Sequence, residues 1–423
     1  MRDVLLKNAR IIDPSRGLDR QGNLLLREGE IAGLGEIVDA PEAEVVDCTG
    51  LVAAPGLVDM HVHLRDPGQT HKEDLFSGCR AAAAGGVTSL LAMPNTSPAM
   101  DSPELVRVLL EKAKEADAAV YTAACITKGL RGEELTDLTA LREAGAIALS
   151  DDGVPVKDTA CLRAALEQAP ALGMTVTCHC EDKYLAGKGI LNEGAVARKL
   201  GVPGIPNSSE DCGVAREIAL AASLGAPVHI CHVSTRVSVE LIRDAKRRGV
   251  RVTAETCPHY LLLTEEELLK RDADYRMNPP LRTEADRLAV LEAVIDGTID
   301  CIVTDHAPHT PEEKADFEKA PNGSIGMETS LAATLTALGG KLPLREILFK
   351  MSTKPAQILG IPAGILEIGA AADIVVFDPE EQWTVDPEKL HGKSKNTPFK
   401  GLELIGRVRM TFFRGRPVYD CME

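Results

Sequence analysis

Residues able to bind a metal ion recur in short apolar stretches of this 423-residue chain. These stretches are VDMHVHLRDPG (58–68), AIALSDDG (146–153), TVTCHCED (175–182), PVHICHVS (227–234) and CIVTDHAP (301–308). Imidazole nitrogens and carboxylate oxygens suit zinc and related divalent ions. No CxxC pair accompanies them, so a structural thiolate site is not indicated. The residue types point to metal-dependent hydrolysis.

The first stretch places His61, His63 and Arg65 at every second position. Alternation along a strand puts all three on one face. A lone buried histidine is usually a hydrogen-bonded core residue, but two on one buried face need something to bind. His229 fits the core role, because alternation places it on the face opposite His232.

Several histidines together with a bridging carboxylate can hold two metal ions about 3.5–4 Å apart with a water between them. Such a pair lowers the pKa of the water and provides hydroxide near neutral pH. The stretch AIALSDDG, expected as the fourth strand, offers two adjacent carboxylates, Asp151 and Asp152. Spacing alone does not choose between them.

The elements that must position these residues alternate between strand and helix. Strands are expected at 57–64, 87–94, 119–126, 146–152, 175–181, 227–234, 251–260 and 301–308. Eight strand–helix units predict an α/β fold, a (β/α)8 TIM-type barrel over residues 53–361. The long interval 261–300 reads as a helix, a loop containing MNPPLR and a second helix. Chemistry in such barrels sits at the carboxyl ends of the strands, where the polar residues fall.

Both ends of the chain have a different sequence pattern. Short runs rich in Leu or β-branched residues are separated there by Gly, Pro and Asp. Residues 1–52 and 362–423 therefore predict one small β-sandwich domain built from the two termini.

The formal net charge of −16 argues against nucleic acid or an anionic membrane surface as a partner. No apolar run of about 18 residues is present for a membrane span, and the N-terminus has no signal core of about 7–15 apolar residues. The eleven cysteines are scattered through apolar runs, as expected of buried thiols in a reducing compartment. We expect a cytoplasmic protein. An anionic substrate would require a locally positive site.

Eight motifs in order resemble the amidohydrolase superfamily and, within it, the bacterial class I dihydroorotases. They are DMHVHLRDPG, AMPNTSP, LSDDG, HCED, CHVST, ETCPHYL, MNPPLR and TDHAPHTPEEK. The HxH pair alone indicates only the superfamily, whereas HLRDPG with MNPPLR and TDHAPH is far more specific. The resemblance covers essentially the whole chain, including the split β domain.

The resemblance implies a zinc enzyme that interconverts dihydroorotate and N-carbamoyl-aspartate in pyrimidine biosynthesis. It implies two zinc ions held by His61, His63, Asp152, His179, His232 and Asp305. Asp305 would also move the proton as general base and then acid. The substrate carboxylate would be held by Arg65, Asn95 and Asn278, and His309 would reach the substrate when its loop closes. Backbone at Asn322 and Gly323 would contact the ring.

Many superfamily members bridge their metals with a carboxylated lysine from the fourth strand. No lysine occurs in GAIALSDDG, and the nearest, Lys157, lies past the turn. An aspartate bridge, Asp152 by the family match, is therefore expected.

Two other hypotheses remain. One is a related cyclic-amide hydrolase such as a hydantoinase or allantoinase; the other is a non-catalytic member that serves as a structural partner of aspartate transcarbamoylase. We expect a small anionic substrate, a homo-oligomer and, as a further partner, aspartate transcarbamoylase.

Overall fold

The computed structural model of the chain describes residues 2–36, 38 and 40–422, and its centre is a parallel eight-stranded barrel. The barrel strands are β6 (Leu57–Val62), β7 (Val87–Ala92), β8 (Ala119–Ala124), β9 (Ala148–Leu149), β10 (Thr175–Cys178), β13 (Val228–Ile230), β14 (Val252–Thr256) and β15 (Cys301–Ile302). They pair in this sequence order. All eight predicted strands are present, and the predicted barrel is confirmed.

The barrel closes between its first and last strands. Val62 forms a parallel bridge with His306, and the His63 N–H donates to the His306 carbonyl at 2.8 Å. Lower down, the buried Asp59 carboxylate accepts from the Thr304 backbone N–H at 3.2 Å and from its hydroxyl at 2.5 Å. Closure therefore brings the start and the end of the barrel together beside the predicted ligands.

Most predicted strands extend too far at their carboxyl ends. The first ends at Val62 rather than at residue 64, and the last at Ile302 rather than at residue 308. The residues beyond these ends include Arg65 and Asp305, whose φ angles are +59° and +48°. This left-handed backbone cannot continue a strand ladder, so the residues expected to do chemistry lie on the turns that follow the strands.

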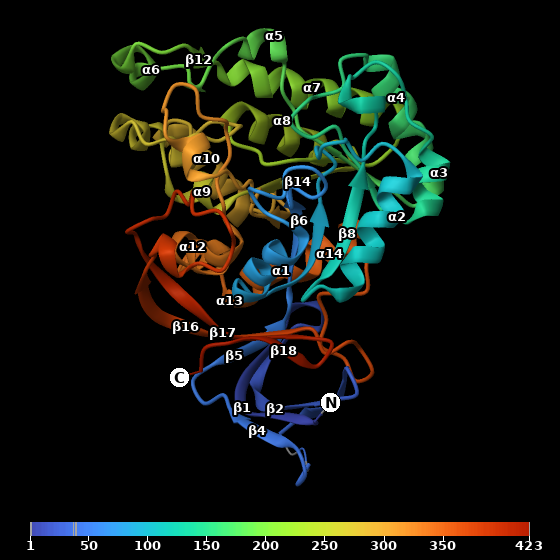
Figure 1. Ribbon diagram of the computed structural model, residues 1–423, viewed down its shortest axis with the longest axis vertical. Coiled ribbons are helices and arrows are strands. Elements are labelled where there is room, and N and C mark those ends of the chain that lie inside the picture. Colours follow the sequence, from blue (N-terminus) through green and yellow to red (C-terminus); the bar gives the residue numbers. More distant parts are fainter. Residues whose placement is uncertain (1, 37, 39, 423) are drawn as a thin grey trace.

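Helices surround the barrel (Figure 1). They include α1 (Leu75–Ala84), α2 (Pro103–Lys112), α3 (Leu138–Ala144), α4 (Thr159–Gln168), α7 (Asn207–Leu224), α8 (Arg236–Arg247), α10 (Glu284–Ile295), α12 (Ser330–Leu338), α13 (Leu344–Leu348) and α14 (Lys354–Leu359). The start of α2 shows why they form here: Ser102 accepts from the Leu105 N–H and Pro103 takes the first helical position. In α8, Val239, Ile242 and Ala245 are buried, which is the periodicity of a helix packed on a sheet.

The interval 261–300 differs in detail from its prediction. Its first helical part is divided between α9 (Pro258–Leu262) and the 3-10 helix η5 (Glu265–Lys270), because Leu263 and Thr264 are extended between them. The second predicted helix is α10. Among the described helices, none is long and apolar enough to cross a membrane.

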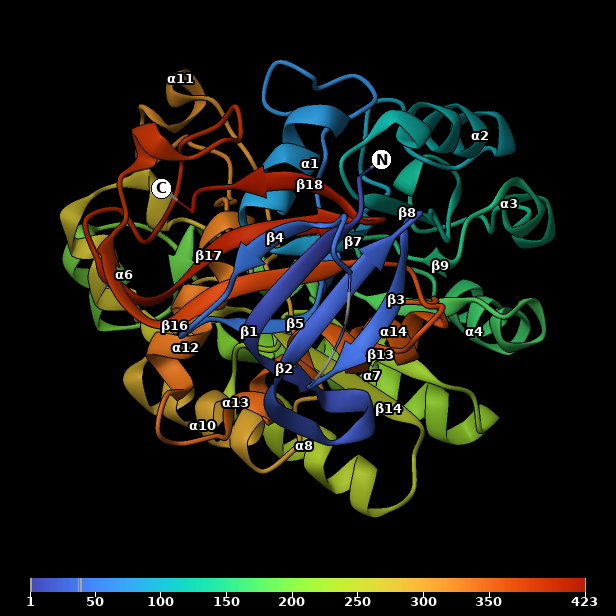
Figure 2. The ribbon, with the colours of Figure 1, turned by 90° about the horizontal axis from the view of Figure 1, so that it is seen from below.

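Strands from both termini form a second sheet below the barrel (Figures 1 and 2). The strands are β1 (Val4–Asp13), β2 (Leu18–Arg27), β3 (Glu30–Gly35), β4 (Glu44–Asp47), β5 (Val52–Pro55), β16 (Ile374–Thr384), β17 (Glu403–Phe413) and β18 (Arg416–Asp420). One apolar cluster joins Leu6 and Leu24 to Val376 and Phe412, so strands from both termini share a core. A β unit built from both termini is confirmed, whereas the domain boundaries at 52 and 361 stay a prediction.

The chain between β16 and β17 leaves this sheet and returns to the barrel. Figure 2 shows the red segment before β17 near the loop that carries α11 (Pro311–Lys314). Four backbone or side-chain hydrogen bonds join Asn396 to that loop. Part of the terminal unit therefore contacts the carboxyl-end face of the barrel.

Candidate metal centre and active site

The predicted site residues meet at one cavity of about 390 Å³ at the carboxyl ends of the barrel strands. Eleven of the twelve line it: His63, Arg65, Asn95, Asp152, His179, His232, Asn278, Asp305, His309, Asn322 and Gly323. His61 is fully buried and lies within 3.3 Å of the Asp152 carboxylate. Closure of the barrel thus brings together residues separated by up to 262 positions.

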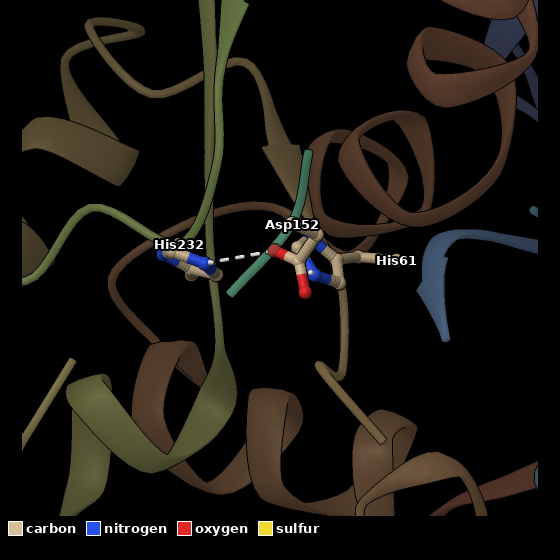
Figure 3. Close-up of side chains that lie close together, drawn as sticks. All are labelled: His61, Asp152 and His232. Carbon is tan, nitrogen blue, oxygen red and sulfur yellow. Dashed lines mark ion pairs between the residues drawn. The ribbon is translucent and has the colours of Figure 1, made fainter. Parts of the chain in front are cut away.

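Asp152 occupies the centre of the histidine cluster (Figure 3). Its Oδ1 lies 3.3 Å from His61 Nε2, 3.5 Å from His179 Nδ1 and 3.7 Å from His232 Nε2. Its Oδ2 lies 3.5 Å from His63 Nε2. Oδ1 thus faces three histidines and Oδ2 the fourth, so one carboxylate contacts all four rings.

The Asp305 carboxylate contacts His61 and His63, the two histidines of the first barrel strand and its end. Its Oδ1 is 3.0 Å from His63 Nε2 and 3.7 Å from His61 Nε2. Two groups close enough to hold a metal ion are His61 with His63 and Asp305, and His61 with Asp152 and His232.

The cluster fits a metal ion by two observations. His61 Nε2 and Asp152 Oδ1 are buried and have no hydrogen-bond partner among the described residues, an arrangement that is costly unless a cation binds them. Ligand atoms around a tetrahedral ion with bonds of about 2.0–2.2 Å lie roughly 3.3–3.6 Å apart. Three of the four separations between Asp152 and its histidines, 3.3, 3.5 and 3.5 Å, fall in that range, and the fourth is 3.7 Å.

Asp151 and Asp152 have different surroundings, which resolves the choice left open by the sequence. The Asp151 carboxylate accepts from the backbone N–H groups of Ile126 and Thr127 at 2.8 and 3.0 Å, and from the Thr127 hydroxyl. Asp151 thus joins two loops, whereas Asp152 faces the histidines. Lys157 is far from this role: its half-exposed side chain lies 3.9 Å from Glu133.

Three of the four histidines have a side-chain acceptor on the ring nitrogen that faces away from the cluster. His61 Nδ1 lies 2.7 Å from the Glu255 carboxylate. His63 Nδ1 lies 2.8 Å from the side-chain oxygen of Asn95, and His179 Nε2 lies 3.2 Å from the Glu181 carboxylate. Each acceptor holds the proton on the outer nitrogen and leaves the inner nitrogen's lone pair for a metal.

His229 does not lie on the far side of the sheet from the cluster, and that expectation is wrong. Its ring is fully buried and contacts Thr253 at 2.8 Å and Glu255 at 2.9 Å, and Glu255 in turn contacts His61. The reason is backbone geometry: β13 ends at Ile230, and His232 has a φ of +35°, so strand alternation does not extend to it. His229 supports the cluster from beneath.

The carboxylates of the cluster are ionised at neutral pH. Burial by itself raises the pKa of Asp152, but the surrounding histidines outweigh it and hold the pKa well below its ordinary value. The same competition lowers the pKa of Asp305 to about 2 and that of Glu255 to about 2. Anionic oxygens are therefore aimed at the position between the histidines.

The opposite wall of the cavity is cationic. Burial lowers the pKa of Arg65 to about 10, which still leaves the guanidinium charged at pH 7. Its Nε donates to the Pro308 carbonyl at 3.2 Å, and Nη2 lies 3.3 Å from His309 Nε2. Lys72 lies 2.9 Å from Glu313 and also lines the cavity. This wall resolves the conflict between an acidic protein and an anionic substrate.

His309 is held by the loop that carries it. Its Nε2 lies 3.0 Å from the Asn322 carbonyl, and its Nδ1 lies 3.1 Å from Glu313. Burial and the neighbouring Arg65 cation hold the pKa of His309 well below its ordinary value. The imidazole is neutral and offers a hydrogen bond rather than a charge.

Asn95 and Asn278 line the same cavity with their amides in contact with the cluster. Asn95 Nδ2 donates to Asp152 Oδ2 at 3.3 Å, in addition to the contact with His63. Asn278 Nδ2 lies 3.3 Å from Glu181 and 3.4 Å from His179 Nε2. Both asparagines therefore help to orient the ligands, and their amides also face the cavity.

Comparison with known proteins identifies the family. A family profile described as "Dihydro-orotase-like" matches residues 50–238. Curated proteins named dihydroorotase from Geobacter sp. strain M21 and Syntrophus aciditrophicus are each 48% identical to this chain, covering 99% of it and 100% and 99% of their own lengths. The chain belongs to the dihydroorotase family.

Solved structures with the same fold come from the neighbouring hydantoinases. The L-hydantoinase (dihydropyrimidinase) of Arthrobacter aurescens superimposes with a TM-score of 0.89 at 25% identity, over 100% of this chain and 97% of that one. The dihydropyrimidinase of Brevibacillus agri NCHU1002 gives 0.86 at 27% identity, over 99% and 95%. These neighbours place the dihydroorotase-family chain among cyclic amidohydrolases with a TIM-type barrel.

Sequence reasoning missed several residues of this dihydroorotase-family site. The sequence pattern gives no role to Glu255 in ETCPHYL or to Glu181 in HCED. Lys72 and Lys183 line the cavity but lie in polar stretches without a pattern. The role of each of these side chains follows from the residue that it contacts, and a sequence does not show such contacts.

A buried arginine in MNPPLR was also missed. Arg282 donates to Ser234 Oγ at 3.1 Å and to Asn192 Oδ1 at 3.0 Å, and its guanidinium lies 3.5 Å from Glu210. It thereby ties the loop that carries Asn278 to the loop that follows His232.

Proposed function

We propose that this protein is a dihydroorotase of class I, which reversibly hydrolyses the cyclic amide of (S)-dihydroorotate to N-carbamoyl-L-aspartate in pyrimidine biosynthesis. The observation that carries the proposal is one cavity with a histidine–aspartate cluster on one wall and the Arg65 guanidinium on the other. Dihydroorotate carries an amide carbonyl and a carboxylate on one small ring. The histidine–aspartate wall suits the carbonyl, and the Arg65 wall suits the carboxylate. Full-length relatives at 48% identity bear the name dihydroorotase.

We propose zinc as the metal, with two ions per chain. His61, His63, Asp152 and Asp305 would hold one ion, and Asp152, His179 and His232 the other. Support comes from the nitrogen and oxygen donors of two close groups, His61–Asp152–His232 and His61–His63–Asp305, and from the contact of Asp152 with His179. Bound metal would supply Lewis acidity that activates water and polarises the scissile carbonyl.

The residues of the chain would bind the substrate and move the proton. Asp305, ionised and next to the cluster, accepts a proton from water and delivers it to the leaving ring nitrogen. Arg65 binds the substrate carboxylate by paired charge-assisted hydrogen bonds, with Asn95 and Asn278 beside it. His309 donates from the loop, and the backbone at Asn322 and Gly323 contacts the ring.

A hydantoinase or dihydropyrimidinase is the second candidate, because the solved structures above carry those names. Two features of the chain favour dihydroorotase. Arg65 requires an anionic group that hydantoin and dihydropyrimidines lack, and Asp152 stands at the bridging position instead of a lysine.

The experiment is a comparison of four substrates with one metal-loaded preparation. We expect kcat/KM for dihydroorotate to exceed the values for hydantoin, dihydrouracil and allantoin by at least about a hundredfold, since a buried cation without its anion is costly. Preference for any uncharged ring would refute the assignment. Arg65→Met should remove the preference by raising KM for dihydroorotate alone.

We also propose a homo-oligomer, association with aspartate transcarbamoylase and a cytoplasmic location. The first two rest on the family resemblance and are tested by light scattering of the pure chain, alone and mixed with that enzyme. The location is supported by the cysteines, eleven free thiols of which nine are buried.

A further inference from the structure

Asn396 belongs to the segment between β16 and β17, far along the chain from the cluster, yet its side chain reaches the loop that carries His309. The side-chain oxygen of Asn396, Oδ1, accepts from the His309 backbone N–H at 3.2 Å. Its amide nitrogen donates to the Ala307 carbonyl at 3.3 Å and to the Gly323 carbonyl at 3.1 Å. One amide thus satisfies backbone groups at both ends of the loop 307–323.

The neighbouring residues strengthen this attachment. The Asn396 backbone carbonyl accepts from the Ile325 N–H at 3.1 Å. Two residues earlier, the Ser394 hydroxyl donates to the Lys72 carbonyl at 2.7 Å, and the Lys393 N–H donates to Glu73 at 3.2 Å. Residues 393–396 therefore hold both loops of the cationic wall, the one with Lys72 and the one with His309.

Burial makes these contacts effective. Asn396 is 4% exposed and Ser394 2%, so water cannot replace a lost partner without entering the protein. An unpaired buried backbone group costs roughly 1–3 kcal/mol. The loop is also held from the barrel side: Arg65 Nε donates to the Pro308 carbonyl, and the Gly323 N–H donates to the Arg276 carbonyl. Asn396 differs from these contacts because its one amide bonds to both ends of the loop.

We propose that Asn396 is a positioning residue for substrate binding: it sets the place of the His309 imidazole and of the Asn322–Gly323 backbone relative to Arg65. It touches no reacting atom and acts through the loop. The inference rests on the proposed function only for its kinetic test, because the position of the loop is measurable without substrate.

The first experiment measures the loop itself by amide hydrogen exchange of the metal-loaded full chain. In Asn396→Ala we expect amides of residues 307–325 to exchange at least about tenfold faster, while those of β8 keep their protection. Asn23→Ala is the matched control, since Asn23 also links two backbone segments, at Asn8 and Glu36, within the terminal sheet. Unchanged exchange in the loop would overturn the proposal.

The second experiment is a double-mutant cycle. We expect Asn396→Ala to lower kcat/KM for dihydroorotate about 10–100-fold, mainly through KM, with metal content unchanged. In a His309→Ala background the same change should cost less than about threefold, because the group it positions is gone. Equal losses in both backgrounds would show general destabilisation and refute the positioning role.

A second variant and the hydrogen-exchange result separate a folding defect, and a failure of the proposed function, from a failure of the positioning role. If Asn396→Ala does not fold, Asn396→Asp keeps the acceptor for the His309 N–H, removes both donors and should show the same changes. If the wild type fails to hydrolyse dihydroorotate, the proposed function fails, yet loop exchange still decides the role of Asn396.

Discussion

The two walls of the cavity are built differently. The histidine–aspartate wall stands on strand ends and the turns directly after them, and its rings are oriented by Glu255, Asn95 and Glu181 within the barrel. The cationic wall stands on two loops that contact residues 393–396, in the segment between two strands of the terminal sheet.

The difference separates two tasks. Ligands for a metal need fixed positions, and a closed parallel barrel supplies them because each strand is held by two neighbours. A wall that must admit and release a substrate needs a loop, and its position then depends on a few hydrogen bonds. Damage to the first wall should therefore appear as lost metal, and damage to the second as weaker substrate binding.

The largest effect is expected at the centre of the first wall. Asp152→Asn should lower bound metal to below one ion per chain and reduce kcat by more than about a thousandfold, since it removes the shared ligand. Asp151→Ala is the contrast: it leaves three hydrogen-bond donors without their acceptor and should cost about 2–3 kcal/mol of unfolding free energy with metal retained. Metal analysis and urea unfolding measure both, and a reversed pattern would exclude Asp152 as the bridge.

Gly323→Ala tests the second wall. Gly323 has a φ of +140°, and an added Cβ would lie 2.8 Å from the Ala307 carbonyl oxygen, so the loop must shift. We expect kcat/KM to fall about a hundredfold with metal content unchanged. Gly340→Ala, at a φ of +73° with open space around it, is the control and should alter stability alone. Loss of metal in Gly323→Ala would break the distinction between the walls.

Glu255→Gln tests the support beneath the first wall. The buried carboxylate accepts from both His61 and His229, and an amide can accept from one while its NH2 opposes the other. Metal affinity should fall about 10–100-fold, measured by competition with a chelating dye, and His229→Phe should have a smaller effect. Glu265→Gln, another buried glutamate, should change nothing in this assay. Wild-type affinity in Glu255→Gln would show that His61 needs no orienting partner.

The smallest effect concerns pH and Lys314 in the loop. Burial lowers the pKa of Lys314 from 10.5 to about 7. Between pH 7 and 10.5 the unfolded chain binds the additional proton, so Lys314 makes stability rise with pH there, by at most about 1.4 kcal/mol per pH unit. Below pH 7 both states are protonated and the effect is constant.

Urea unfolding of wild type and Lys314→Met at pH 7 and 9.5 checks this sign. The wild type should gain stability relative to the variant as pH rises, whereas Lys319→Met, at an exposed site nearby, should track the wild type. A constant difference between wild type and Lys314→Met would contradict the lowered pKa.

The barrel and most of the first wall were predictable from the sequence. Strand–helix alternation indicated eight units, and His61 with His63 on one short apolar stretch indicated a metal. Apolar patterning carries such information because burial on a strand leaves few residue types. Strand ends were predicted too far along, because left-handed turns at Arg65, His232 and Asp305 leave no signal in composition.

The sequence by itself determined the residue types of the site, their order along the barrel and, through the motifs, the family. Only the tertiary structure decided that Asp152 rather than Asp151 faces the histidines, that His229 supports the cluster through Glu255, and that Asn396 holds the loop of His309. The physical reason is that a pattern records whether a side chain is buried, whereas its partner depends on how the barrel closes and where distant segments return.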